Sequence, residues 1–250
     1  MPAIYHILNG DALLASFPST IAGPRIIARE CLIEGSLVGE TISDFWKTRA
    51  AFIEAYFGES QANYHLKVVT EFQKMIELPE EATINLWFED DLFCLVNCWF
   101  CLSLLKSSHT VYLVKPNVEQ GWLGFGQMSP SDLEKAFKKR ILLTPTEKMQ
   151  LLSCWQAYRT NDFAQLRKVA ATPNRCFPKL QAVCQAHLDR FPATDTLSRP
   201  LQILQDILNE QTDKSFRTVF PIFSKQAGIY GFGDLQVKHM YHQLLPEIEV

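Results

Sequence analysis

The chain has 250 residues, of which 47% are hydrophobic and 20% are charged, and its formal net charge at pH 7 is −3. Its longest apolar run, residues 92–105, is shorter than the ~18 to 20 residues that a membrane-spanning helix requires, and it contains Asn97. We therefore expect an ordinary globular chain with no membrane partner.

The cysteines and the first residues indicate the compartment. Seven cysteines at irregular spacing, an odd number, do not form the framework of a small secreted domain. The N-terminal stretch lacks the basic segment, apolar core and cleavage site of a secretory signal. These features predict a cytoplasmic protein with reduced thiols.

The two halves differ in charge. Residues 1–120 contain 8 Lys and Arg against 15 Asp and Glu, whereas residues 121–250 contain 16 against 12. Opposite signs indicate two units that attract each other, or an acidic site that faces a basic one. Residues 138–140 are the one basic cluster, and a solvated helix end explains them, so nucleic acid is a weaker candidate partner.

Short apolar runs alternate with helical patterns in the first half. The runs have the composition and length of buried strands. They cover residues 4–9, 25–31, 83–89 and 110–116. Helical periodicity covers residues 42–58, 61–79 and 91–108, the first with Ser43 or Asp44 as N-cap and Gly58 as its end. This alternation predicts a Rossmann-like parallel α/β domain over residues 1–118.

The second half, residues 119–250, is predicted to be a mostly helical domain, helix-turn-helix-like at its end. Amphipathic or capped helical patterns recur along it. They cover residues 129–140, 144–161, 162–171, 177–191, 197–210 and 234–247. Residues 216–223, FRTVFPIF, are the one stretch that resembles a strand.

Polar residues follow each predicted strand of the first half. They are Asn9, Gly10 and Asp11, then Arg29, Glu30 and Glu34, then Glu89, Asp90 and Asp91, and finally Lys115. Ligands of open α/β sheets bind outside the carboxyl ends of the strands, and here carboxylates are expected from three strand ends. Such a cluster requires a cation, a shared proton or water, so it indicates a divalent metal, a ligand amine or a carboxyl of raised pKa.

We assign candidate roles on this basis. Asp11, Glu30 and Asp91 are the candidate catalytic groups, and Asp11 and Asp91 the candidate ligands of a divalent metal. The candidate ligand-binding residues are Asn9, Gly10, Arg29, Glu34, Glu89, His187 and Arg190. The alternative is structural: Asp11 and Asp91 would be helix N-caps, and residues 9–11 a tight turn.

His187 and Arg190 lie on one face of a predicted helix. With Arg175 and Arg199 they are either the basic counterpart of the acidic edge, able to hold an anion, or surface charges. His6, on the first strand, is interpreted as a core histidine with satisfied hydrogen bonds.

Two further motifs have structural explanations. Cys94, Cys98 and Cys101 share a helical face, but they lie in a nearly uninterrupted apolar helix and are interpreted as small buried residues rather than metal ligands. Residues 230–236, YGFGDLQ, repeat the glycine and aspartate pattern of residues 9–11. An N-cap at Asp234 explains them, and they remain a secondary candidate.

Several motifs occur in an order that resembles a known family. They are HILNGDAL, RECLIEG, LWFEDDLFC with NCWF, LTPTEKMQLLSCWQAY, AHLDRFP and YGFGDLQ. Together they resemble the bacterial domain of unknown function 1835 family and its associated small C-terminal domain. The resemblance implies no particular reaction. Relatives often have Gln where this chain has Leu95, and Pro where it has Ser36.

The sequence thus favours an enzyme that acts on a small polar or phosphorylated metabolite at a strand-end acidic pocket, with a divalent metal as candidate cofactor. There is no phosphate loop, GxSxG elbow or HExxH pair, which argues against common nucleotide-binding and hydrolytic classes. The alternatives are a regulatory module whose helical half binds nucleic acid or a protein, and an assembly role.

Overall fold

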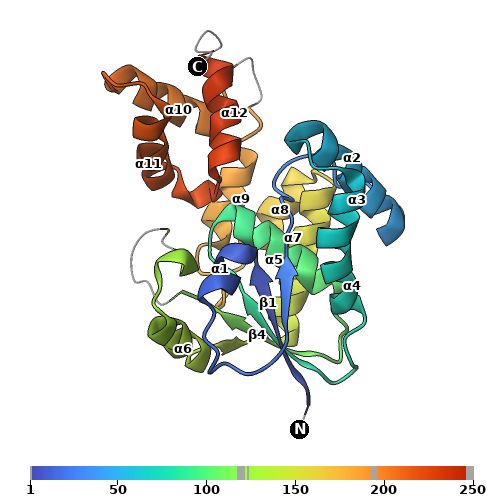
Figure 1. Ribbon diagram of the computed structural model, residues 1–250. Coiled ribbons are helices and arrows are strands. Elements are labelled where there is room, and N and C mark those ends of the chain that lie inside the picture. The colour runs from blue at the N-terminus through green and yellow to red at the C-terminus, as the bar shows by residue number, and fades with distance from the viewer. Residues whose placement is uncertain (1, 117–121, 123, 193–195, 246–250) are drawn as a thin grey trace.

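The computed structural model describes residues 2–116, 122, 124–192 and 196–245 (Figure 1). Its centre is a five-stranded sheet. The strands are β1 (Ile4–Asn9), β2 (Arg25–Ala28), β3 (Thr83–Trp87), β4 (Thr110–Val114) and β5 (Ile141–Leu142), in the order β2-β1-β3-β4-β5. The first four are parallel, and β5 is antiparallel to β4. The predicted parallel α/β fold is therefore confirmed, while the two-residue strand β5 has no sequence signal.

Helices cover both faces of the sheet, because side chains alternate along each strand. Leu8, in register with Ile27 and Trp87, packs with α1 (Asp11–Ser16) and α6 (Pro130–Lys138). Ile7 and its neighbours face α4 (Thr70–Ile76) and α5 (Leu92–Leu104). On the first face His6 is buried, with Nε2 3.0 Å from the carbonyl oxygen of Ala22, so its interpretation as a satisfied core histidine is confirmed.

Local signals decide where the connecting helices begin and end. Helix α2 (Ile42–Phe57) starts at Thr41, whose hydroxyl accepts from the amide of Asp44, so the predicted cap at Ser43 or Asp44 was two or three residues late. Gly58 ends α2 in the left-handed conformation, as predicted. The chain continues through α3 (Gln61–Tyr64) and the π-helical segment η1 (His65–Val69) into α4.

The two halves of the chain share one apolar core. Helix α7 (Pro145–Arg159) packs against the buried helix α5, and β5 adds to the sheet of the first half. The predicted domain boundary at residues 118 and 119 lies outside the described residues, and the two-domain division stays a prediction.

The remaining elements belong to the second half, which is mostly helical as predicted. They are η2 (Phe125–Gln127), α8 (Phe163–Ala170), α9 (Leu180–Leu188), α10 (Arg199–Glu210), α11 (Phe216–Gln226), η3 (Gly228–Tyr230) and α12 (Asp234–Leu244). The strand predicted over residues 216–223 is wrong, because this stretch lies in α11. Its residues Val219 and Phe223 are four apart and both buried, a helical spacing that outweighs the strand-like composition.

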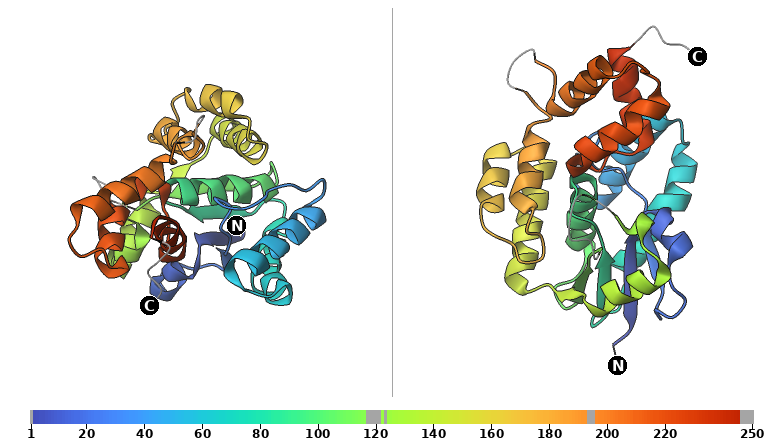
Figure 2. Two further views of the ribbon diagram at one scale, coloured as in Figure 1. Left: turned by 90° about the horizontal axis from the view of Figure 1, so that it is seen from above. Right: turned by 90° about the vertical axis from the view of Figure 1, so that its left-hand side faces the viewer.

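Helices α10, α11 and α12 lie beyond the carboxyl ends of the strands, at the opposite end of the molecule from the N-terminus (Figures 1 and 2). The chain therefore brings its last helices to the edge where the sequence places its polar residues. Among the helices described, none has both the length and the apolar character that a membrane crossing needs.

Candidate functional site

The strand order reverses beside β1. The chain moves from β1 to β2 on one side and then returns to β3 on the other side, so the ends of β1 and β3 flank a topological switch point. Open α/β sheets bind their ligands at such a point. Asn9 is the last residue of β1, and Glu89 lies two residues past the end of β3.

A cavity of about 500 Å³ opens at the carboxyl ends of β1 and β2. Five of the predicted site residues line it: Asn9, Gly10, Asp11, Arg29 and Glu30. Gly10 has a φ of 82°, which favours glycine and turns the chain sharply from β1 into α1. We call this space the strand-end cavity, and its volume lies within the usual range for small-molecule sites.

Asp11 and Arg29 form a two-point ion pair in this cavity. Nε and Nη2 of Arg29 each donate to one carboxylate oxygen of Asp11 over 2.7 Å. Hydrogen bonding from Arg29 lowers the pKa of Asp11, so this carboxyl is ionised at neutral pH. The alternative of Asp11 as an N-cap is wrong, since Gly10 occupies the cap position of α1 and no side chain bonds there.

A second contact ties Arg29 to the π-helical segment. Nη1 of Arg29 donates to the backbone oxygen of Lys67 over 2.9 Å. Short π-helical turns inside helices occur frequently at functional sites. The side chain of Lys67 also lines the strand-end cavity, where it lies 3.5 Å from a carboxylate oxygen of Glu59.

Glu30 is held by a fully buried arginine. Nε and Nη2 of Arg49 each donate to one of its carboxylate oxygens over 2.9 Å, and neither side chain is exposed to solvent. The hydroxyl of Tyr64 and the amide of Cys31 also donate to this carboxylate. Glu30 therefore has four donors and anchors α2 and α3 to the end of β2.

Asn97, within α5, connects the end of β1 to the segment that follows β2. Its Nδ2 donates to Oδ1 of Asn9 over 3.0 Å and to the carbonyl oxygen of Glu30 over 2.7 Å. The amide of Leu32 donates to its Oδ1 over 3.4 Å. In the sequence, Asn97 stands out only as an interruption of an apolar run. A single amide side chain in an otherwise apolar, buried helix could have indicated these contacts, because a buried amide needs hydrogen-bond partners.

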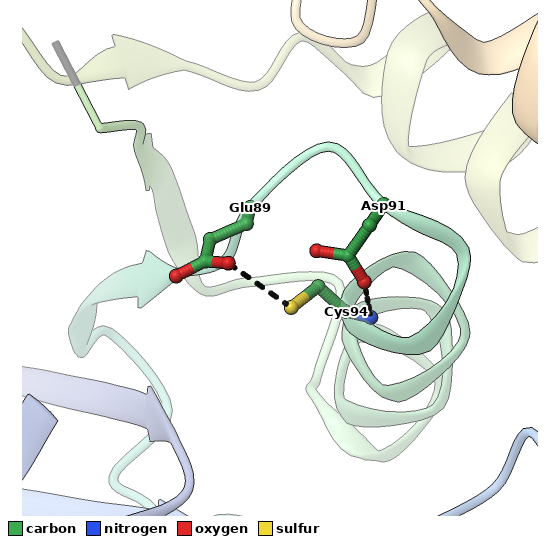
Figure 3. Close-up of side chains that lie close together, drawn as sticks. All are labelled: Glu89, Asp91 and Cys94. Carbon is green, nitrogen blue, oxygen red and sulfur yellow. Dashed lines mark hydrogen bonds between the residues drawn. The ribbon is translucent and has the colours of Figure 1, made fainter. Parts of the chain in front are cut away.

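Glu89, Asp91 and Cys94 converge where α5 begins (Figure 3). The thiol of Cys94 lies 3.9 Å from Oε2 of Glu89, and Oδ1 of Asp91 accepts from the amide of Cys94 over 2.9 Å. The expectation that Asp91 is an N-cap is thus confirmed. Nδ2 of Asn9 donates to the sulfur of Cys94 over 3.0 Å, which places this Glu89–Asp91–Cys94 cluster beside the strand-end cavity.

Burial dominates the electrostatics of the cluster. Burial, together with the charge of Asp91, raises the pKa of Glu89 to about 7. Burial also raises the pKa of Asp91, and it raises that of the Cys94 thiol well above its usual value. Glu89 is therefore a carboxyl that exchanges its proton near neutral pH, as catalytic acids and bases do.

Two glycines from the second half cover this cluster. A Cβ atom at Gly231 would overlap the carboxylate of Asp91, and one at Gly124 would overlap the carboxylate of Glu89. Gly231 also has a φ of 66°, in the left-handed region. The motif at residues 230–236 therefore contacts the cluster directly, in addition to forming the start of α12.

The cluster has donors suited to a divalent metal. One ligand atom from each of Glu89, Asp91 and Cys94 lies within 4.8 Å of the others, and carboxylate oxygen with thiolate sulfur is a donor set that Zn²⁺ accepts. Asp11, the second predicted metal ligand, is not part of this group and pairs with Arg29 instead. A bound metal stays a prediction.

The other predicted residues lie apart from the strand-end cavity. Glu34, His187 and Arg190 line a second cavity between the two halves, described below. His187 is only 2% exposed, so its interpretation as a surface charge is wrong. Arg175 pairs with Glu147 over 3.1 Å, while Lys115 pairs with Asp90.

Comparison of the chain with protein-family models, with curated proteins and with solved structures finds no match. The resemblance to the domain of unknown function 1835 family therefore stays a prediction.

Proposed function

We propose that this protein binds a small polar or phosphorylated metabolite in the strand-end cavity. The observation that carries the proposal is the position of this cavity at the carboxyl ends of β1 and β2, next to the switch point, with Arg29 and Lys67 on its lining. Arg29 is oriented by Asp11 and by the π-helical segment, so its guanidinium is held in place before a ligand arrives.

The lining indicates the chemistry of the ligand. Apolar side chains form much of the wall, namely Ile53, Phe57, Val68, Phe93 and Leu235. The exposed pair of Lys67 and Glu59 is weak, so the Lys67 ammonium can turn toward a ligand anion. We infer a ligand with an apolar or ring-shaped body and an anionic group, which Arg29 and Lys67 would hold.

A catalytic role would rest on Glu89, which lies beside the strand-end cavity rather than on its lining. Asn9 lines the cavity and contacts Cys94, which in turn lies next to Glu89. Asp11 and Glu30 are each bound by an arginine, so Glu89 is the better candidate for acid–base chemistry. We propose Glu89 as the acid–base group of an enzyme of this class, and Asp11 as the residue that positions Arg29.

A thermal-shift screen tests the binding proposal. The probes are adenosine 5′-monophosphate, ribose 5-phosphate and glucose 6-phosphate, and titration calorimetry measures the Kd of any probe that raises the Tm. We expect Arg29→Gln to weaken binding at least 10-fold, or about 1.4 kcal/mol, because it removes a charged donor.

Lys47→Gln is the matched control, since Lys47 belongs to an exposed ion pair away from the cavity. The proposal fails if no probe stabilises the wild-type protein, or if Arg29→Gln and Lys47→Gln leave the same Kd.

A further inference from the structure

A second cavity of about 410 Å³ lies between the two halves of the chain. The segment of residues 33–38 and the α2 residues Phe52 and Tyr56 form one side, and α7 and α9 form the other. None of its lining residues lines the strand-end cavity. We call it the His187 cavity.

His187 is buried in this cavity without a hydrogen-bond partner. The residue is 2% exposed, and neither ring nitrogen has a partner among the described residues. Its ring centroid lies 4.4 Å from that of Tyr158 and 5.2 Å from that of Phe191, so aromatic rings surround it. Buried polar groups in native proteins almost always have partners, and an unpaired one requires an explanation.

Arg190 adds a second unused donor. Its Nη1 is buried and has no partner among the described residues, while its guanidinium lies over the rings of Phe191 and Phe232, at 5.6 and 5.7 Å from their centroids. Arg190 follows His187 by three residues, so both side chains reach the cavity from the end of α9.

The charges around the cavity favour an anion. Arg159 and Arg190 contribute two positive charges, and Glu34 contributes one negative charge. Burial and the neighbouring Glu34 carboxylate raise the pKa of Tyr56 to about 12, so this hydroxyl adds no charge at pH 7. The cavity therefore has one positive charge in excess, which matches a single anionic group.

The unused donors match a carboxylate better than a phosphate. Burial and the neighbouring Arg190 lower the pKa of His187 to about 3, so the ring is neutral at pH 7 and offers one N–H group. The cavity thus offers two unused donor groups, the N–H of His187 and Nη1 of Arg190, and a carboxylate has two oxygens to accept from them. A phosphate brings a third oxygen and about −1.5 to −2 charges toward Glu34.

We propose that the His187 cavity binds a small organic carboxylate, with His187 and Arg190 donating to its two oxygens. Ile33, Leu37 and Phe52 would contact the apolar body of this ligand. The inference does not rest on the function proposed for the strand-end cavity, because the two sites share no residue.

Titration calorimetry on the full chain tests this site. It compares the Kd values of acetate, benzoate and 4-hydroxybenzoate with that of inorganic phosphate. We expect at least one carboxylate to bind, and more tightly than phosphate. We expect Arg190→Gln and His187→Phe each to weaken that carboxylate at least 10-fold. His187→Phe keeps the aromatic packing and removes both unpaired nitrogens, so its Tm should equal or exceed that of the wild type.

Arg175→Gln, outside the cavity, and Arg29→Gln, in the strand-end cavity, should leave carboxylate binding unchanged. The proposal is overturned if no carboxylate binds, if phosphate binds more tightly, or if His187→Phe retains the wild-type Kd. If Arg29→Gln changes the Kd of the carboxylate, the proposal is also overturned, because the carboxylate then binds in the strand-end cavity.

Discussion

At the scale of single residues, the carboxyl groups of the site are of two kinds: those that pair with an arginine, and one whose pKa burial raises to near neutral pH. Glu30 and Asp11 belong to the first kind, and Glu89 belongs to the second. This division separates residues that hold the site together from the one suited to exchange a proton.

The buried ion pair predicts a large effect on stability. Arg49→Met leaves the Glu30 carboxylate buried without its counter-charge, so we expect the free energy of unfolding to fall by about 3–5 kcal/mol. Urea unfolding measures the change. Lys47→Met, on the same helix but in an exposed pair, should cost less than about 1 kcal/mol. Equal losses in the two variants would contradict this role of Arg49.

Glu89 predicts a pH dependence with a definite sign. Its pKa is about 7 in the folded protein against an ordinary value of 4.5, so between these values the folded protein retains a proton that the unfolded chain has released. The free energy of unfolding therefore falls as the pH rises through this window, by at most about 3 kcal/mol.

Glu89→Gln removes this titration, so the wild type should lose stability relative to the variant between pH 4.5 and pH 7. Urea unfolding at several pH values measures the difference, and Glu40→Gln, at an exposed carboxyl, is the control. Parallel pH profiles for the wild type and Glu89→Gln would show that the Glu89 pKa is not raised.

At the scale of elements, the periodicity of the first half predicts β1 to β4 and the helices after β2 and β3, because strand and helix periods differ clearly. It does not predict the short helix α1 between β1 and β2. The partners of the site residues escape prediction for a different reason. Arg49 and Lys67 come from helices whose orientation depends on packing, so their contacts with Glu30 and Arg29 are set by the tertiary fold.

In the loop before α12, adding a single methyl group at Gly231 is expected to destabilise the protein. Gly231→Ala would strain a left-handed backbone and force a Cβ atom against the carboxylate of Asp91. We expect the free energy of unfolding to fall by about 1–3 kcal/mol. Gly126→Ala is the matched control, since no atom lies within 4 Å of a Cβ there. Thermal unfolding that gives the two variants the same Tm would refute the close contact.

At the scale of the whole molecule, the second half closes over the carboxyl edge of the sheet. Leu235 of α12 lines the strand-end cavity, and Nε2 of Gln236 donates to the sulfur of Cys31 over 3.4 Å. The sequence predicts a single acidic pocket, but the predicted residues lie in three places. These are the strand-end cavity with its two ion pairs, the Glu89–Asp91–Cys94 cluster, and the His187 cavity. Strand ends alone could not predict this, because residues more than 200 positions apart complete the site.

The most direct test of the account is a crystal structure of the protein with the tightest-binding phosphorylated probe. We predict that its phosphate lies in the strand-end cavity within hydrogen-bond distance of Arg29 and Lys67, with its body against Phe57 and Phe93. A probe that occupies only the His187 cavity or the outer surface would contradict the central claim.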